Sequence, residues 1–128
     1  KKIFIDFYLL PIFCREMHIK NTTKKTLLAK DAKLCKSIFS IARGLMFSKP
    51  RPLIFIFEKE KIVPLHMFFV FYQIEILFLD KNKKVVEMKK NFSPFTFYDP
   101  KNKSKYVIEL PIGAIKNSKT EIKDAIEF

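Results

Sequence analysis

Short runs of apolar, β-branched and aromatic residues alternate with charged or proline-containing segments along most of this chain. Runs of this length and composition favour β-strands over helices. The charged segments at residues 58–61 and 80–84 each follow such a run and predict turns, the second of them in a hairpin. We therefore expect strands over residues 17–21, 25–30, 53–57, 65–71, 74–79, 85–88, 106–110 and 126–128.

Two segments have helical features instead. Leu34, Ile38 and Ile41 recur at helical spacing, which predicts a helix that begins near Asp31. A second, shorter helix is expected directly after Pro111, because proline suits the first position of a helix. The sequence therefore predicts a mostly β fold, a compact β-sandwich or barrel with one or two short helices.

The longest apolar segment covers residues 62–79 and is nearly continuous. Pro64, His66, Gln73 and Glu75 interrupt it, and a membrane span would leave these polar groups in lipid at a cost of several kcal/mol each. We therefore expect no transmembrane segment. Continuous apolar strands instead indicate burial on both faces, as inside a sandwich or closed barrel.

The first residues differ from the rest of the chain. Two lysines and an apolar run resemble a signal peptide, but Asp6 and Pro11 interrupt the run and no small-residue cleavage site follows. Met17 precedes an ordinary basic strand. We expect a single β-rich domain over residues 17–128, with residues 1–16 as an upstream extension or a peripheral segment.

The chain carries 25 basic and 13 acidic residues, for a net charge of +12. A charge of this size favours anionic partners, either a small molecule or nucleic acid. An alternative is that the many lysines only solvate the surface, since nucleic-acid readers use arginine more often. The two cysteines, Cys14 and Cys35, do not form a metal-ligand pattern and fit a reducing, cytoplasmic compartment, with Cys35 expected to be buried.

The sequence lacks a recognisable catalytic set. It has no glycine-rich phosphate loop, no nucleophile elbow and no metal-ligand spacing, so we expect no cofactor and no metal. Glu75 lies in an apparently buried strand and needs a partner there, for which an ion pair with Arg43 would serve. The candidate ligand-binding residues are Arg43, His66, Glu75 and Glu109, each of which also has a purely structural interpretation.

Residues 81–105 combine a local charge of +6, from eight lysines less two acidic residues, with four aromatic residues. Basic groups interleaved with aromatic faces are typical of single-stranded nucleic-acid grooves. The alternative is that the phenylalanines pack under a loop as a small additional core. The candidate nucleic-acid-binding residues are Lys83, Lys84, Lys89, Lys90, Phe92, Lys101, Lys103 and Lys105.

Four stretches follow one another along the chain: Arg43-Gly44-Leu45-Met46-Phe47, Leu53-Ile54-Phe55-Ile56-Phe57, His66-Met67 with residues 74–80, and residues 106–111 with Gly113. In this order they resemble the uncharacterised family known as domain of unknown function 192, in an archaeal-like form. The resemblance covers about residues 22–128 and implies an all-β sandwich or barrel with small helices, without an established activity. Many family members look like Trp-Met-x-Asn-Thr at residues 66–70, where this chain ends in Phe69 and Val70, so a polar pair is replaced.

Three hypotheses follow for the function. We favour a non-enzymatic binding or interaction module for an anionic ligand or partner, because charge and aromatic residues suggest contact surfaces. The second hypothesis is a single-stranded nucleic-acid binder that uses residues 81–105. The third is an enzyme with a polar pocket around Arg43, Glu75 and Glu109, which requires those side chains to converge.

Overall fold

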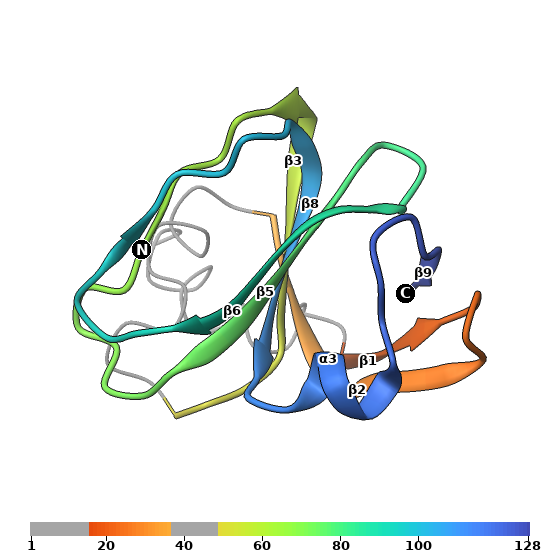
Figure 1. Cartoon of the computed structure of the whole chain (residues 1–128), viewed down its shortest axis with the longest axis horizontal. Helices are drawn as coiled ribbons and strands as arrows, with labels where there is room; N and C mark the ends of the chain where they lie inside the picture. Colours follow the sequence, from red (N-terminus) through yellow and green to blue (C-terminus); the bar gives the residue numbers. More distant parts are fainter. Residues whose placement is uncertain (1–15, 37–48) are drawn as a thin grey trace, which may run out of the picture.

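The computed structural model describes residues 16–36 and 49–128, and it confirms a mostly β fold built on one curled sheet with a short helix (Figure 1). The main sheet has the strand order β6-β5-β8-β3-β2-β1-β9, and β4 pairs separately with β7. The elements are β1 (Glu16–Asn21), β2 (Thr26–Cys35), β3 (Leu53–Lys61), β4 (Leu65–His66), β5 (Ile74–Leu79), β6 (Val85–Phe92), β7 (Phe97–Tyr98), β8 (Ser104–Pro111), α3 (Ala114–Ser118) and β9 (Ile126–Glu127).

The two edges of the main sheet meet at one end. The Val85 N–H donates to the carbonyl of Asp124 at 2.9 Å, and the Lys123 N–H donates to the carbonyl of Val85 at 2.8 Å. The Ile126 N–H donates to the carbonyl of Lys83 at 2.9 Å. These bonds satisfy backbone groups that an open edge would expose, and they curl the sheet into a partly closed barrel.

The inside of this barrel holds one of two hydrophobic cores, which we call the inner core. Every strand of the main sheet contributes to it, and Ile115 of α3 enters it from the helix. Its buried members are Ile19, Leu28, Ala32, Ile54, Leu77, Leu79, Val85, Ile108, Leu110, Ile115 and Ile126.

The opposite face of the sheet carries the second core, which we call the outer core. Loop residues such as Met67 and Val70 cover it, together with Tyr98 of β7. Its buried members are Cys35, Leu53, Phe55, Val63, Met67, Val70, Ile74, Ile76, Phe78, Phe92 and Val107. Because β5 lies between the two cores, all six of its residues are buried, which confirms burial on both faces.

Most expected strands are present, several of them longer than the apolar run that predicts them. The predicted strands at residues 53–57, 74–79, 85–88 and 106–110 are confirmed within β3, β5, β6 and β8. The helix expected after Pro111 is also confirmed, as α3. Within the described residues, no helix is long and apolar enough to cross a bilayer.

Three local expectations are wrong. Asp31 and Leu34 lie inside β2, which pairs in parallel with β3, so the helix does not begin there; residues 37–48 lie outside the described part. The charged residues 58–61 continue β3 instead of forming a turn, because Lys61 pairs with Ser104 of β8. The strand expected over residues 65–71 is a strand only in β4, Leu65–His66. Residues 1–15, the expected upstream or peripheral segment, lie outside the described part.

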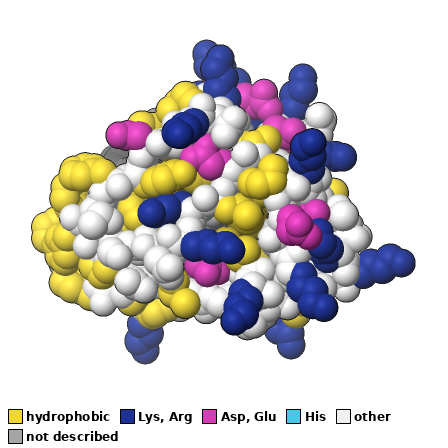
Figure 2. Space-filling view, viewed as in Figure 1, with side chains coloured by type: hydrophobic (Ala, Val, Ile, Leu, Met, Phe, Trp, Pro, Cys, Tyr) yellow, Lys and Arg dark blue, Asp and Glu magenta, His cyan; other side chains and the backbone are white. Residues whose placement is uncertain are grey.

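Five phenylalanines remain in contact with solvent, four of them in two neighbouring loops and one on β7, and we call them the aromatic patch. The β4–β7 pair brings these two loops together. Figure 2 shows hydrophobic side chains gathered at the left end of the molecule, whereas lysines and arginines are scattered over the rest of this face. The patch consists of Phe68, Phe69, Phe71, Phe95 and Phe97.

Burial predicts opposite outcomes for two phenylalanines of the same size. Phe78 is fully buried in the outer core, whereas Phe97 is 68% exposed. We expect Phe78→Ala to lower the free energy of unfolding by about 3–5 kcal/mol, and Phe97→Ala by less than about 1 kcal/mol. Urea denaturation of both variants measures the difference. Equal losses would contradict the assignment of the outer core.

Candidate functional site

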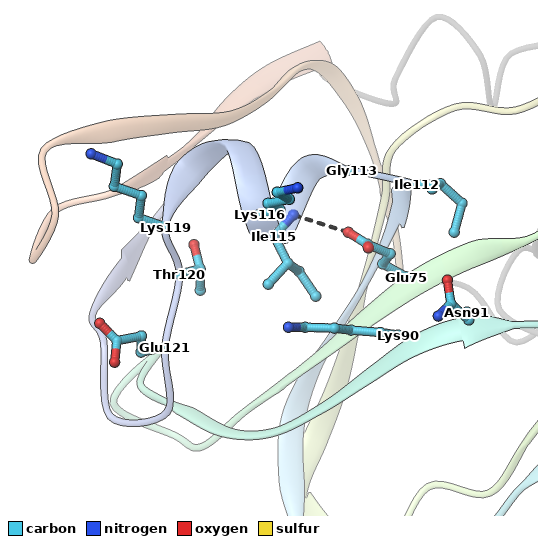
Figure 3. Close-up of a pocket in the computed structure, with 10 residues that line it drawn as sticks. All are labelled: Glu75, Lys90, Asn91, Ile112, Gly113, Ile115, Lys116, Lys119, Thr120 and Glu121. Atoms are coloured by element: carbon cyan, nitrogen blue, oxygen red, sulfur yellow. Dashed lines mark hydrogen bonds between the residues drawn. The ribbon is translucent and has the colours of Figure 1, made fainter.

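The described residues form a hollow of about 480 Å³ between β5, β6 and the α3 segment (Figure 3). Its volume lies within the range of small-ligand sites. Ile112 and Ile115 supply apolar surface, and the remaining lining groups are mostly charged or polar. The lining residues are Glu75, Lys90, Asn91, Ile112, Gly113, Ile115, Lys116, Lys119, Thr120 and Glu121.

Glu75 is the buried acidic group of this hollow, with 5% of its surface exposed. Its Oε1 atom accepts a hydrogen bond of 2.9 Å from the backbone N–H of Ile115 in the first turn of α3. A buried carboxylate needs such a donor. The bond therefore fixes α3 against the sheet, and it gives Glu75 a structural partner different from the ion pair expected from the sequence.

The backbone before α3 sets the direction of the helix. Gly113 precedes α3 with φ of +95°, a left-handed conformation that strains residues with a side chain. Lys119 ends the helix with φ of 59°, and its N–H bonds to the carbonyl of Lys116 at 3.1 Å. The short helix thereby places Lys116 and Lys119 on the rim of the hollow.

An irregularity in the β5–β6 pairing supplies the third lysine. Ile74 pairs with Phe92 and Ile76 pairs with Lys89, so two residues of β6 lie opposite the single Glu75. These two residues are Lys90 and Asn91, and Asn91 has a left-handed φ of 53°. Bulges of this kind redirect side chains. Figure 3 shows the Lys90 side chain extending from β6 toward Ile115.

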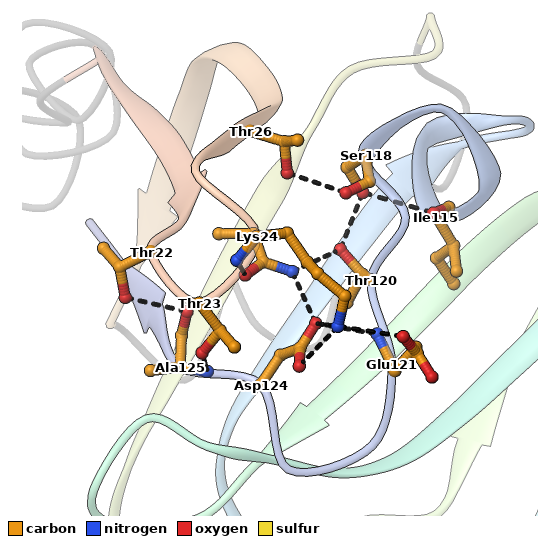
Figure 4. Close-up of polar contacts among 11 residues, drawn as sticks. Thr22, Thr23, Lys24, Thr26, Ile115, Ser118, Thr120, Glu121, Asp124 and Ala125 are labelled. Carbon is orange, nitrogen blue, oxygen red and sulfur yellow. Dashed lines mark hydrogen bonds and ion pairs between the residues drawn. The ribbon is translucent and has the colours of Figure 1, made fainter.

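A polar network holds the chain behind the hollow (Figure 4). The buried Asn21 amide donates to Thr120 Oγ1 and Asp124 Oδ2, both at 2.9 Å, and Lys24 Nζ contacts Asp124 and Glu121 at 2.9 Å. Burial raises the pKa of Asp124, but bonds from Asn21, the Glu121 N–H and Lys24 outweigh it and keep the pKa below its usual value. The network therefore provides Thr120, Glu121 and Asp124 with hydrogen-bond or ion-pair partners within the protein.

The lysines of the hollow, in contrast to Lys24, have no described partner for their ammonium groups. Lys90, Lys116 and Lys119 form no ion pair or hydrogen bond through their ammonium groups with any described residue. Of the two acidic groups, Glu121 is ion-paired with Lys24, whereas Glu75 accepts a bond from a neutral N–H, which does not cancel a carboxylate charge. With three lysines against two carboxylates, the net charge of the lining is positive, which suits a carboxylate or phosphate group beside an apolar body.

The structure separates the four candidate residues proposed from the sequence. Glu75 pairs with Leu110 of the inner core, whereas Glu109 pairs with Ile76 of the outer core, so their side chains lie on opposite faces of the sheet. His66 is exposed, and its Nδ1 accepts the Phe68 N–H at 3.2 Å. Arg43 lies outside the described residues. Glu75 and Glu109 therefore do not share a pocket.

The lysines proposed for nucleic-acid binding also lie on both faces. Lys83 Nζ lies 4.0 Å from the centroid of the Phe128 ring beside the inner core, and Lys90 lines the hollow. Lys89 lies over the Tyr98 ring at 5.4 Å, on the outer side. Phe92 is fully buried, as the alternative of a packed loop requires, whereas Phe95 and Phe97 are exposed. Of the candidate lysines, Lys83 and Lys89 therefore lie on opposite sides of the sheet.

Sequence reasoning missed Lys116 and Lys119, although Lys90 was among the candidates. The available signal was Pro111 followed by Gly113 and a basic turn, which places lysines on a short helix. Within residues 16–36 and 49–128, no group of three or more His, Cys, Asp or Glu side chains could hold a metal ion.

Comparisons with known proteins agree with this fold. The family model DUF192, Uncharacterized ACR, matches residues 18–128. A UPF0127 protein of Thermococcus sibiricus is 36% identical over 112 residues, which cover 84% of this chain and 72% of the relative. A UPF0127 protein of Pyrococcus horikoshii is 34% identical over 113 residues, which cover 86% of this chain and 97% of the relative.

Among solved structures, a protein of unknown function from Novosphingobium aromaticivorans superposes with a TM-score of 0.75. The sequences are 18% identical, and the match covers 87% of this chain and 82% of that chain. At this identity the likeness supports the fold alone.

Glu109 gives a pH-dependent prediction. Burial raises its pKa to about 8, and no described residue donates a hydrogen bond to its carboxylate. Between the usual pKa of 4.5 and about 8, the folded state binds more protons than the unfolded state, so Glu109 lowers stability as pH rises. We expect Glu109→Gln to gain stability relative to the wild type between about pH 5 and pH 8.

Urea unfolding midpoints over this pH range measure the effect. Glu58→Gln is the control, because it makes the same substitution at an exposed position. A Glu109→Gln profile that stays parallel to that of the wild type would show that the Glu109 carboxyl ionises normally in the folded protein.

Proposed function

This chain belongs to the DUF192 family, and from the hollow between β6 and α3 we propose that it is a binding module for a small anionic ligand. The ligand class is a compact carboxylate or phosphate compound with some apolar surface. The proposal makes the expected anionic partner more specific, because it assigns the binding to one place on the molecule.

The observation that carries the proposal is that three lysines without a described ion-pair partner line one hollow. Lys90, Lys116 and Lys119 all border the same concavity, although Figure 3 shows the Lys119 ammonium pointing away from Lys90. An anion bound among them would form charge-assisted hydrogen bonds, which are stronger than bonds between neutral groups.

The lining favours binding over chemistry. It contains no histidine, cysteine or serine, and its hydroxyl group, that of Thr120, contacts Ser118 Oγ at 2.6 Å. The carboxylate of Glu75 is held by the Ile115 N–H. Neither group is positioned as a general base next to a nucleophile. Shape, charge and apolar surface are what the hollow offers to a ligand.

The lining also favours organic over inorganic anions. The apolar side chains of Ile112 and Ile115 can contact the hydrocarbon part of a ligand, whereas an inorganic anion would contact only the lysines. Because Lys116 and Lys119 are exposed at the rim, salt should weaken the attraction. An organic anion is therefore expected to bind more tightly than inorganic phosphate at equal charge.

The test uses citrate and inorganic pyrophosphate as probes with the 128-residue chain. We expect either probe to shift the backbone amide resonances of Asn91 and residues 113–120, measured by two-dimensional NMR. The double variant Lys116→Gln/Lys119→Gln should weaken binding by roughly tenfold or more, because two charge-assisted contacts are lost.

The matched control is Lys59→Gln/Lys103→Gln, which removes the same charge from exposed positions outside the hollow. It should retain wild-type affinity. Equal weakening in both double variants would show non-specific attraction to net charge. Shifts spread over all lysine-rich segments, or no shifts, would reject the hollow as the site.

A further inference from the structure

Glu75 has hydrogen-bonding capacity that the fold does not use. A carboxylate accepts bonds on both oxygens, and burial makes each missing partner costly. Among the described residues, the Ile115 N–H donates to Oε1, and no group donates to Oε2. Because only 5% of the residue is exposed, little water reaches it from outside. One oxygen of a buried carboxylate is therefore left without a partner in the described part of the chain.

The unused oxygen opens into the hollow. Within residues 16–36 and 49–128, Ser104 Oγ is the unbonded side-chain atom that is fully enclosed, so Glu75 Oε2 retains some contact with its surroundings. Glu75 lines the hollow, and Figure 3 shows its carboxylate beside the first turn of α3. A donor that enters the hollow can therefore reach Oε2.

The lysines of the hollow do not neutralise this carboxylate. Lys90 lies opposite Glu75 in the irregular β5–β6 pairing, but its ammonium group forms no ion pair with Glu75. Lys116 and Lys119, on the α3 side of the hollow, form none with it either. Cations and a buried anion thus line one concavity without contacting one another, so both kinds of charge are open to a ligand.

We propose that the hollow binds a zwitterionic α-amino acid with an apolar side chain. The ammonium group of the ligand donates to Glu75 Oε2, its carboxylate is bound by the lysines, and its side chain packs on Ile112 and Ile115. This assignment, which rests on the anion binding proposed above, names the ligand class of the same site.

The charges of the hollow favour a zwitterion over a simple anion. A simple anion would contact the lysines but would place its negative charge near the carboxylate of Glu75, which repels it. An α-amino acid carries a cation and an anion on one carbon atom, and Glu75 and Lys90 stand on neighbouring strands, which are about 4.8 Å apart. Both ends of such a ligand can therefore contact groups of opposite charge.

Size and ligand chemistry argue against two other occupants. A volume of about 480 Å³ lies in the lower half of the range for small-ligand sites, which suits an amino acid better than a large cofactor. A metal ion would have to bind among three lysines, and of the two carboxylates in the lining, Glu121 is already paired with Lys24. The positive group that Glu75 accepts is therefore expected to belong to an organic molecule.

The test compares three probes that share a hydrocarbon body. Leucine carries both charges, isocaproate lacks the ammonium group, and isoamylamine lacks the carboxylate. Isothermal titration calorimetry with the 128-residue chain measures their affinities at neutral pH. We expect leucine to bind about tenfold or more tightly than either analogue, because only leucine forms both charged contacts. This comparison uses the unaltered chain, so it does not depend on the folding of a variant.

The variant Glu75→Gln separates the charge of this residue from its structural bond. The amide oxygen of glutamine can still accept the Ile115 N–H, whereas its amide nitrogen replaces an acceptor with a donor. The preference for leucine over isocaproate should disappear. Isocaproate should bind as tightly as before or more tightly, because the charge that repels it is gone.

The matched control is Glu121→Gln, which makes the same substitution at the other carboxylate of the lining and should keep the preference for leucine. The variant Lys116→Gln/Lys119→Gln should weaken leucine and isocaproate by the same factor and should not weaken isoamylamine. Thermal unfolding shows whether each variant is folded.

The outcomes separate the zwitterion from the anion site itself. Equal affinity of the unaltered chain for leucine and isocaproate would overturn the zwitterion and leave the anion site intact, as would a preference for leucine that Glu75→Gln retains. Citrate shifts at residues 113–120 without leucine binding would have the same meaning. Isoamylamine that binds as tightly as leucine, or no response to any of the five probes, would reject the anion site as well.

Discussion

The complete burial of β5 on both faces is the constraint that organises this molecule. Six consecutive buried residues require a hydrophobic layer on each side of the strand, and the chain supplies them as the inner and outer cores. The one charged residue on β5, Glu75, must find a donor in the interior, and the Ile115 N–H is that donor. That bond positions α3, and α3 positions two lysines of the hollow.

The apolar runs predicted the strands because the hydrophobicity of a short segment indicates whether its side chains are buried. Burial of residues 74–79 on both faces could be predicted, because they lack the apolar–polar alternation of a strand with one solvent-exposed face. The failures involve distant partners. Leu34 and Ile38 have helical spacing, but residues 33–35 pair with β3, and this parallel pairing leaves no mark in the local pattern. Lys61 stays extended because Ser104 lies opposite it.

Only part of the candidate site could be predicted from the sequence, because strand register decides which side chains share a face of the sheet. A charged residue within an apolar run identified Glu75 as a buried group that needs a partner. Whether Glu109 could join it depended on which residue lies opposite, and a shift of one residue moves a side chain to the other face. Here Glu75 lies opposite Leu110, so the two acids are separated. Lys119 was missed because a five-residue helix after Gly113 sets its direction.

The hollow differs from the interior in what its side chains contact. Among the described residues, Ser104 Oγ is the buried side-chain atom without a hydrogen bond, and the Glu109 carboxylate has no described donor. The lining of the hollow instead combines three lysines, whose ammonium groups have no described partner, with the apolar side chains of Ile112 and Ile115. Exposed lysines contribute little to stability, so folding gains little from this arrangement. Cations beside apolar surface are what an organic anion would contact.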